Sequence, residues 1–194
     1  MPTVTQKQLP TESFTSAGEW RRWLCENHAR SDGVRLRIFK NDSGMRTVTY
    51  AEALDEALCF GWIDGQKQTY DEKSWLQRFT PRRPKSLWSK RNRERVAQLI
   101  EEGRMTPFGL KQVEAAKADG RWNDAYDAQS AMTVPRDFLE RLSENEQALA
   151  FFATLNRANL YAIAWRLQTA KKPATREKRM QAILEMLAQG KPLH

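Results

Sequence analysis

The chain has 194 residues, of which 40% are hydrophobic and 10% aromatic, so it can form a domain with a hydrophobic core, and wholesale disorder is excluded. The formal net charge of +8 favours an anionic partner, whether nucleic acid, a phosphorylated metabolite or an acidic surface. Two cysteines are too few for a disulfide framework, and no stretch approaches the roughly 18 apolar residues of a membrane-spanning helix. We therefore expect a cytoplasmic protein without a transmembrane segment.

The first part of the chain predicts a helix followed by a strand. Residues 1–12 carry no apolar segment and are expected to form a loose lead-in. Ser16 with Glu19 forms a capping box, in which two side chains satisfy backbone N–H groups at the start of a helix. Apolar and charged residues then alternate over residues 34–38, as in a half-buried strand, and turn-forming residues follow at 41–44.

A second helix and a pair of strands are predicted next. Thr49 with Glu52 is a second capping box, and Gly61 interrupts the helical pattern that the box begins. Residues 62–65 and 74–80 are predicted to be strands around a polar turn. This order of elements is typical of an antiparallel hairpin that follows a helix.

Beyond the hairpin the sequence predicts a loop and two more helices. Two prolines interrupt any strand over residues 80–85, which makes this stretch an irregular basic loop. Either Ser86 or Ser89 caps the next helix, which Gly103 ends. Residues 106–120 form another helix, with threonine as its N-cap and proline at its first position.

The C-terminal part is predicted to be helical throughout. Residues 122–133 lose periodicity and serve as a connector. Pro135 opens a short helix, and Ser143 with Glu146 caps another. Two further helices with apolar faces complete the chain.

Together these elements predict an α+β protein in which helices are segregated from a small antiparallel sheet. We expect the loose lead-in at residues 1–12, an α+β core domain at residues 13–128, and an all-helical C-terminal subdomain at residues 134–194 that packs on it.

The most informative stretch is the basic segment, residues 78–95, which carries eight Lys or Arg against one Glu. Aromatic residues are interspersed in and around this charge, among them Trp75, Phe79 and Trp88. Aromatic planes beside guanidinium groups suit a planar or anionic partner, through cation–π contacts and charge-assisted hydrogen bonds. The pattern therefore predicts a binding surface.

The sequence gives less support for a catalytic site or a metal site than for a binding surface. Cys25 and His28 have a metal-like spacing, but the chain offers too few further Cys or His ligands for a structural zinc site, so we expect no metal or cofactor. Phosphate-loop and dinucleotide-binding motifs are absent. Cys59 is expected to be a packed thiol, with a reactive thiol as the alternative. Asp64 is either a base or ligand-orienting carboxylate beside the arginines, or part of an Asp-Gly turn.

Several long strings resemble the bacteriocin-protection family, also called YdeI/OmpD-associated. They are ALCFGWIDG, RFTPRRPKSLWSKRN, LIEEGRMTPFGL, AKADGRW and the C-terminal stretch that begins FFATLNRANLYAIAWRLQ. The resemblance extends over residues 14–190 and implies a role in protection against bacteriocins or cationic antimicrobial peptides. It implies no catalytic residues.

We therefore expect a non-enzymatic binding or stress-protection protein that captures an anionic or aromatic small molecule. In this hypothesis arginines neutralise charge, Trp62 and Trp88 stack, and Asp64 and Asn92 orient the ligand. Nucleic-acid association and an enzyme that uses Asp64 or Cys59 are the alternatives. The candidate ligand-binding residues are Cys59, Trp62, Asp64, Arg78, Phe79, Thr80, Arg82, Arg83, Trp88, Ser89, Asn92 and Arg95.

Overall fold

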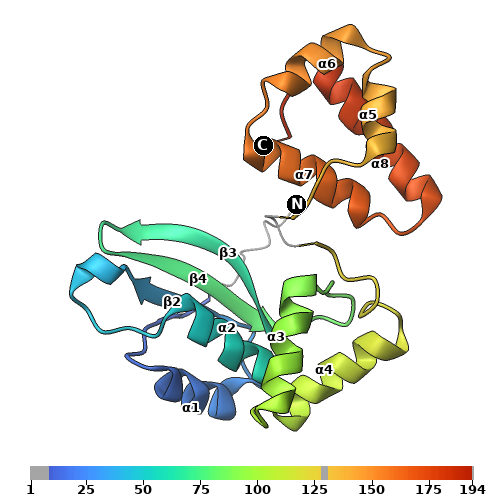
Figure 1. The fold of residues 1–194 in the computed structure, drawn as a ribbon. Coiled ribbons are helices and arrows are strands. Elements are labelled where there is room, and N and C mark those ends of the chain that lie inside the picture. The colour runs from blue at the N-terminus through green and yellow to red at the C-terminus, as the bar shows by residue number, and fades with distance from the viewer. Residues whose placement is uncertain (1–8, 128–130, 194) are drawn as a thin grey trace, which may run out of the picture. The chain divides into compact units, whose positions relative to one another are not determined.

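The computed structural model describes residues 9–127 and 131–193 and is an α+β structure (Figure 1). The chain divides into two compact units. The N-terminal unit comprises Met1–Trp88 and Asn92–Asp124, and the C-terminal unit comprises Ser89–Arg91 and Ala125–His194. Among the described residues, no helix combines the length and the apolar character needed to span a membrane.

The N-terminal unit is built on a four-stranded sheet with the order β1-β2-β4-β3. The strands β2, β4 and β3 are antiparallel neighbours, as expected, but β1 pairs with β2 in parallel, so the sheet is mixed. Thr11 and Glu12 form β1, so these two residues of the expected lead-in are paired with a strand, and residues 1–8 lie outside the described residues. The other strands are β2 (Val34–Phe39), β3 (Trp62–Asp71) and β4 (Ser74–Pro81).

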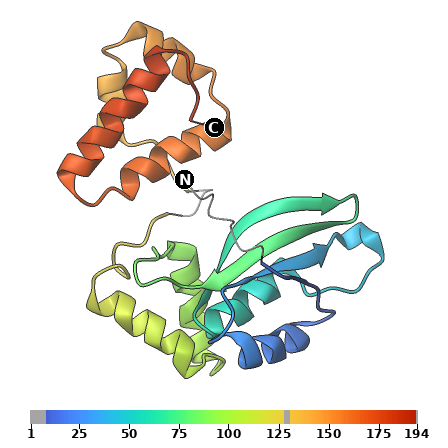
Figure 2. The same ribbon diagram turned by 180° about the vertical axis from the view of Figure 1, so that it is seen from behind.

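Two helices, α1 (Ala17–Asn27) and α2 (Tyr50–Cys59), lie on the same face of this sheet in both views (Figures 1 and 2). Ser16 caps α1, and a complete capping box with Thr49 starts α2, so both predicted starts are confirmed. The apolar residues of β2 are buried against the helices, while its arginines alternate toward the other face. The indole of Trp20 fixes α1 to α2 by donating to the Ala53 carbonyl at 3.0 Å.

Gly61 ends α2 and redirects the chain into β3. Its φ of +74° lies in the left-handed region, which favours glycine, and a Cβ there would lie 2.8 Å from Cγ of Gln112. The predicted interruption at this residue is therefore confirmed. The space beside Gly61 is occupied by α4, so the same residue makes the turn and admits the neighbouring helix.

The remaining helices of this part are α3 (Lys90–Glu101) and α4 (Pro107–Ala118). Of the two serines predicted as caps of α3, Ser89 directly precedes the helix. Thr106 caps α4 as predicted, and its hydroxyl donates to the Cys59 carbonyl at 2.6 Å. This bond joins the start of α4 to the end of α2.

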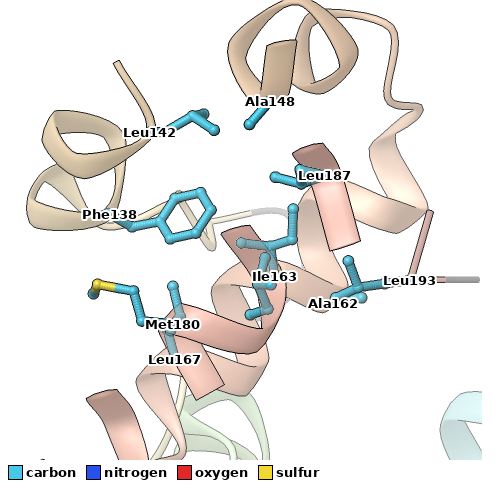
Figure 3. Packing of buried hydrophobic residues seen from close by; sticks show 10 residues of the cluster. Phe138, Leu142, Ala148, Ala162, Ile163, Leu167, Met180, Leu187 and Leu193 are labelled. Carbon is cyan, nitrogen blue, oxygen red and sulfur yellow. The ribbon is translucent and has the colours of Figure 1, made fainter. Parts of the chain in front are cut away.

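The C-terminal unit consists of α5 (Arg136–Leu142), α6 (Glu146–Ala153), α7 (Arg157–Gln168) and α8 (Pro173–Ala188). The four helices enclose a separate hydrophobic core (Figure 3). Its buried residues are Phe138, Leu142, Ala148, Ala162, Ile163, Leu167, Met180, Ile183, Leu187 and Leu193.

The predicted cap of α6 was wrong. Asn145 caps this helix by accepting from the Ala148 N–H at 2.9 Å, whereas the Ser143 hydroxyl donates to the Glu140 carbonyl at 2.6 Å. Ser143 has helical dihedrals because it still belongs to the end of α5, and an N-cap needs the extended backbone that Asn145 adopts.

Gly109 gives a direct test of how closely α4 approaches α2. An alanine Cβ at this position would lie 2.3 Å from the Cys59 carbonyl oxygen and 2.8 Å from Cε of Met105. We expect Gly109→Ala to lower the free energy of unfolding by about 1–3 kcal/mol, the usual cost of overpacking. Urea unfolding monitored by tryptophan fluorescence measures this loss.

The matched control is Gly18→Ala in α1, where the nearest heavy atom to the added Cβ is 3.9 Å away. We expect this variant to be at least as stable as the wild type, because alanine favours a helix over glycine. Equal stability of the two variants would contradict the close packing of α4 on α2.

Candidate functional site

The face of the sheet opposite α1 and α2 carries two arginines side by side. Arg35 of β2 and Arg78 of β4 are direct partners in the antiparallel register, so their side chains emerge on the same face. Like charges in this position destabilise a strand pair. The next pair in the register, Val34 with Phe79, is buried in the core on the other face.

These arginines belong to a cationic pocket with a volume of about 1220 Å³. Besides Arg35 and Arg78, the pocket is lined by four further basic residues, and Asp32 is the one acidic residue among the described residues that line it. The complete lining is Leu9, His28, Ala29, Arg30, Ser31, Asp32, Arg35, Gln66, Lys67, Gln68, Leu76, Arg78, Thr80, Pro81, Arg82, Arg83 and Pro84.

Most of this positive charge has no carboxylate beside it. Arg35 donates through Nε to the Leu9 carbonyl at 3.2 Å, and Arg30 donates to the Asn27 amide oxygen at 3.4 Å. Lys67 lies over the Trp75 ring, 4.5 Å from its centroid. Among the described residues, the side chains that line the pocket without an ion pair to a carboxylate are Arg30, Arg35, Lys67, Arg78 and Arg83.

Four of the candidate residues, Arg78, Thr80, Arg82 and Arg83, line this pocket. Arg82 is the most enclosed of them, with 7% of its surface exposed. Its guanidinium lies 3.5 Å from the centroid of the Trp88 ring, and Nη1 donates to the Leu87 carbonyl at 3.1 Å. The ring and the carbonyl therefore fix the orientation of Arg82 within the pocket wall.

The aromatic candidates do not line the pocket. Trp62 and Trp88 are 1% and 2% exposed, and Phe79 is fully buried, so none of these rings is open for a ligand to stack on. Trp62 packs edge-on against Trp20 and Trp23 in the core. Neither tryptophan therefore presents a ring face to the pocket, because these large apolar rings fill the interior beside the strand ends.

Ser89 and Asn92 are also buried, and neither lines the pocket. Asp64 is half-buried and accepts a hydrogen bond from the Tyr50 hydroxyl at 2.8 Å. This bond ties β3 to the start of α2, which is a structural role. The predicted ligand-orienting roles of Asp64 and Asn92 thus find no support in their positions.

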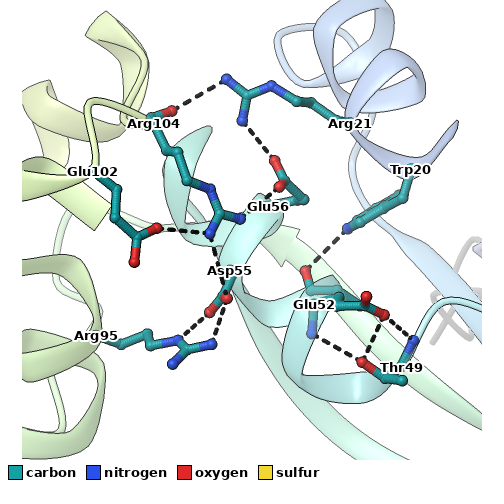
Figure 4. A network of polar contacts seen from close by, with 10 residues as sticks. Trp20, Arg21, Thr49, Glu52, Asp55, Glu56, Arg95, Glu102 and Arg104 are labelled. Carbon is teal, nitrogen blue, oxygen red and sulfur yellow. Dashed lines mark hydrogen bonds and ion pairs between the residues drawn. The ribbon is translucent and has the colours of Figure 1, made fainter. Parts of the chain in front are cut away.

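Arg95 takes part in an ion-pair network around α2 and does not line the pocket (Figure 4). It contacts both carboxylate oxygens of Asp55, and this hydrogen bonding raises the pKa of Arg95 above its ordinary value. The adjacent Glu56 accepts from Arg21 at 2.6 Å and from Arg104 at 2.7 Å. Both carboxylates are buried, so the network is part of how α1 and α3 pack on α2.

Cys59 lies in the core, where burial raises the pKa of its thiol to about 11. The thiol is therefore protonated at neutral pH, which argues against a nucleophile. Within residues 9–127 and 131–193, no three His, Cys, Asp or Glu side chains are grouped as a metal site would require.

Sequence reasoning missed Arg30, Arg35 and Lys67, which the fold brings to the pocket from outside the basic segment. One signal was present for Arg35. The alternation over residues 34–38 places the charged residues of this strand on the face away from the core.

Two family models match the chain. Residues 12–112 match the model described as Domain of unknown function (DUF8412). The chain belongs to the DUF8412 family. All pocket residues except Leu9 lie within the DUF8412 match.

The C-terminal part of this DUF8412 protein, residues 131–190, matches the model described as Bacteriocin-protection, YdeI or OmpD-Associated. The resemblance expected from the sequence over residues 14–190 is thus confirmed for residues 131–190, the helical C-terminal part. The DUF8412 match accounts for most of the N-terminal unit instead. No curated protein and no protein of solved structure is significantly similar to the chain.

Substitution of Glu56 tests whether the ion-pair network around α2 stabilises the fold. We expect Glu56→Gln to lower the free energy of unfolding by about 1–3 kcal/mol, because it removes a buried charge that is shared by two arginines. This loss is smaller than the roughly 3–5 kcal/mol that removing one partner of a fully buried pair costs. The reason is that Arg21 and Arg104 are partly exposed to solvent, which screens the interaction. Urea unfolding measures it, and an equal loss in the exposed control Glu114→Gln would contradict the assigned role.

The raised pKa of Cys59 predicts how the stability of the folded chain depends on pH. Its pKa rises from 9.0 to about 11 in the folded chain, so between these values the unfolded chain releases the proton more readily. The free energy of unfolding is therefore expected to fall as the pH rises from 9 to 11, and this part of the fall is absent in Cys59→Ala. Denaturant unfolding over this pH range measures the difference.

Alkylation provides the control. At pH 8 iodoacetamide is expected to label the exposed Cys25 in the folded protein and to leave Cys59 unmodified. Labelling of both thiols at the same rate would contradict the burial of Cys59.

Proposed function

We propose that this chain is a non-enzymatic anion-binding protein whose cationic pocket is the ligand site. The observation that carries the proposal is the apposition of Arg35 and Arg78 on the face of the sheet opposite α1 and α2, in a pocket with one acidic lining residue among those described. An anion between two guanidinium groups converts their repulsion into charge-assisted hydrogen bonds.

The pocket lining favours an anionic over an aromatic ligand. No Phe, Tyr or Trp belongs to the part of the lining that the structure describes, so a planar ligand would find no large aromatic ring to stack on, whereas basic side chains are numerous. Guanidinium groups offer several N–H donors in a planar fork, the geometry that matches phosphate and carboxylate oxygens.

The match of residues 131–190 to a bacteriocin-protection model supports a protective role for the whole protein. We propose that anion binding in the N-terminal unit is the activity that this chain contributes to protection, in the cytoplasm. The distribution of residues supports this division, because the pocket lies in the N-terminal unit and the bacteriocin-protection match lies in the C-terminal part.

The binding test uses citrate and sulfate, titrated calorimetrically into the full-length protein at constant ionic strength. Arg78→Gln is expected to weaken binding about tenfold, because one lost charge-assisted contact contributes about 1.4 kcal/mol or more. Without added anion, Arg78→Gln is expected to melt no lower than the wild type, since the substitution removes the repulsion with Arg35.

Arg22→Gln is the matched control, because it removes the same charge from an exposed position of α1 outside the pocket. Equal weakening by the two substitutions would show that only net charge matters and would exclude the pocket as the site. In bacteriocin-sensitive cells, expression of the wild type is expected to increase survival more than expression of Arg78→Gln at the same protein level.

A further inference from the structure

We infer that the cationic pocket takes a ligand with several linked phosphate groups, such as a condensed phosphate or a nucleoside polyphosphate. This inference rests on the proposed function and specifies its ligand class. It follows from the size of the pocket, the spread of its charge and the kind of cation that lines it.

The size of the pocket exceeds what one small anion needs. Its volume of about 1220 Å³ is somewhat above the range for sites that hold whole metabolites or drug-sized ligands, roughly 300–1,000 Å³. A single phosphate or sulfate ion would contact only one part of such a wall.

The charge is spread along the pocket and is not gathered at one point. Arg35 and Arg78 lie on the sheet, whereas Arg82 and Arg83 follow the end of β4 at Pro81. The Cα atoms of Arg78 and Arg82 are four positions apart, which is roughly 13 Å of extended chain at about 3.3 Å per residue. A chain of phosphates can extend along such a row of cations and contact more of them than a single tetrahedral anion does.

The positions of two of these arginines are set before a ligand binds. A Cβ at Gly65 would lie 3.5–3.6 Å from the aliphatic carbons of Arg78, so the stem of Arg78 crosses β3 where the strand has no side chain. The second of these arginines, Arg82, is oriented by the Trp88 ring and the Leu87 carbonyl. Side chains already ordered in this way lose less entropy on binding.

The kind of cation also favours phosphate. Five of the six basic residues that line the pocket among the described residues are arginines, and arginine binds phosphate oxygens in a bidentate manner. The neutral polar residues Ser31, Gln66, Gln68 and Thr80 line the same pocket and can bond further phosphate oxygens or a sugar attached to them.

Calorimetric titration of the full-length protein with orthophosphate, pyrophosphate and tripolyphosphate at constant ionic strength, without divalent cations, tests the inference. Affinity is expected to rise with chain length, with tripolyphosphate at least about tenfold tighter than orthophosphate. Arg78→Gln on β4 and Arg83→Gln in the loop that follows β4 are each expected to weaken tripolyphosphate binding about tenfold. Arg22→Gln again provides the control.

Titration with ATP distinguishes a nucleoside polyphosphate from an inorganic condensed phosphate as the ligand. Tighter binding of ATP than of tripolyphosphate assigns the pocket to a nucleoside polyphosphate, and the reverse order assigns it to an inorganic condensed phosphate. Both results support the inference.

Affinities that do not change with phosphate chain length would overturn the inference, while the proposed function stands if citrate binding still depends on Arg78. If no anion binds in an Arg78-dependent manner, both fail. Single-stranded DNA that binds more tightly than any small phosphate, with affinity that falls steeply with salt, would also overturn the inference in favour of nucleic-acid association.

Discussion

The alternation of β2 is the constraint on which the rest of the N-terminal unit depends. Its apolar residues must face α1 and α2, and a period of two then forces Arg35 and Arg37 onto the opposite face. The antiparallel register with β4 places Arg78 opposite Arg35. The hydrophobic packing on one face is therefore what holds like charges together on the other, and this pairing of charges is the basis of the proposed anion site.

The protein neutralises its arginines selectively. Around α2 the buried carboxylates Asp55 and Glu56 pair with arginines from α1, α3 and the chain that precedes α4, and these pairs stabilise helix packing (Figure 4). In the pocket, described side chains such as Arg78 on β4 and Arg83 in the loop after it have no carboxylate partner, whereas Arg37 on the same sheet face pairs with Asp71. Around α2 and in the pocket, the role of an arginine thus depends on whether a carboxylate lies beside it.

Arg82 and Trp88 connect the core to the pocket. The tryptophan ring is buried, yet its face contacts the guanidinium of an arginine that lines the pocket. Trp88 therefore contributes to the pocket indirectly, by holding the cation of Arg82 in place. In the proposed function, a ligand contacts the guanidinium and not the ring.

The sequence by itself determined the elements and the sign of the charge. Helix caps such as Thr49, the break at Gly61 and the alternation of residues 34–38 are local signals, because each depends on neighbours within a few residues. Only the tertiary structure decided which arginines share a site. Arg30, Lys67 and Arg83 are far apart in the chain and line the same pocket, while Arg95, close to Arg83 in sequence, pairs with Asp55. Distances between distant segments depend on packing and register, and no short sequence pattern encodes them.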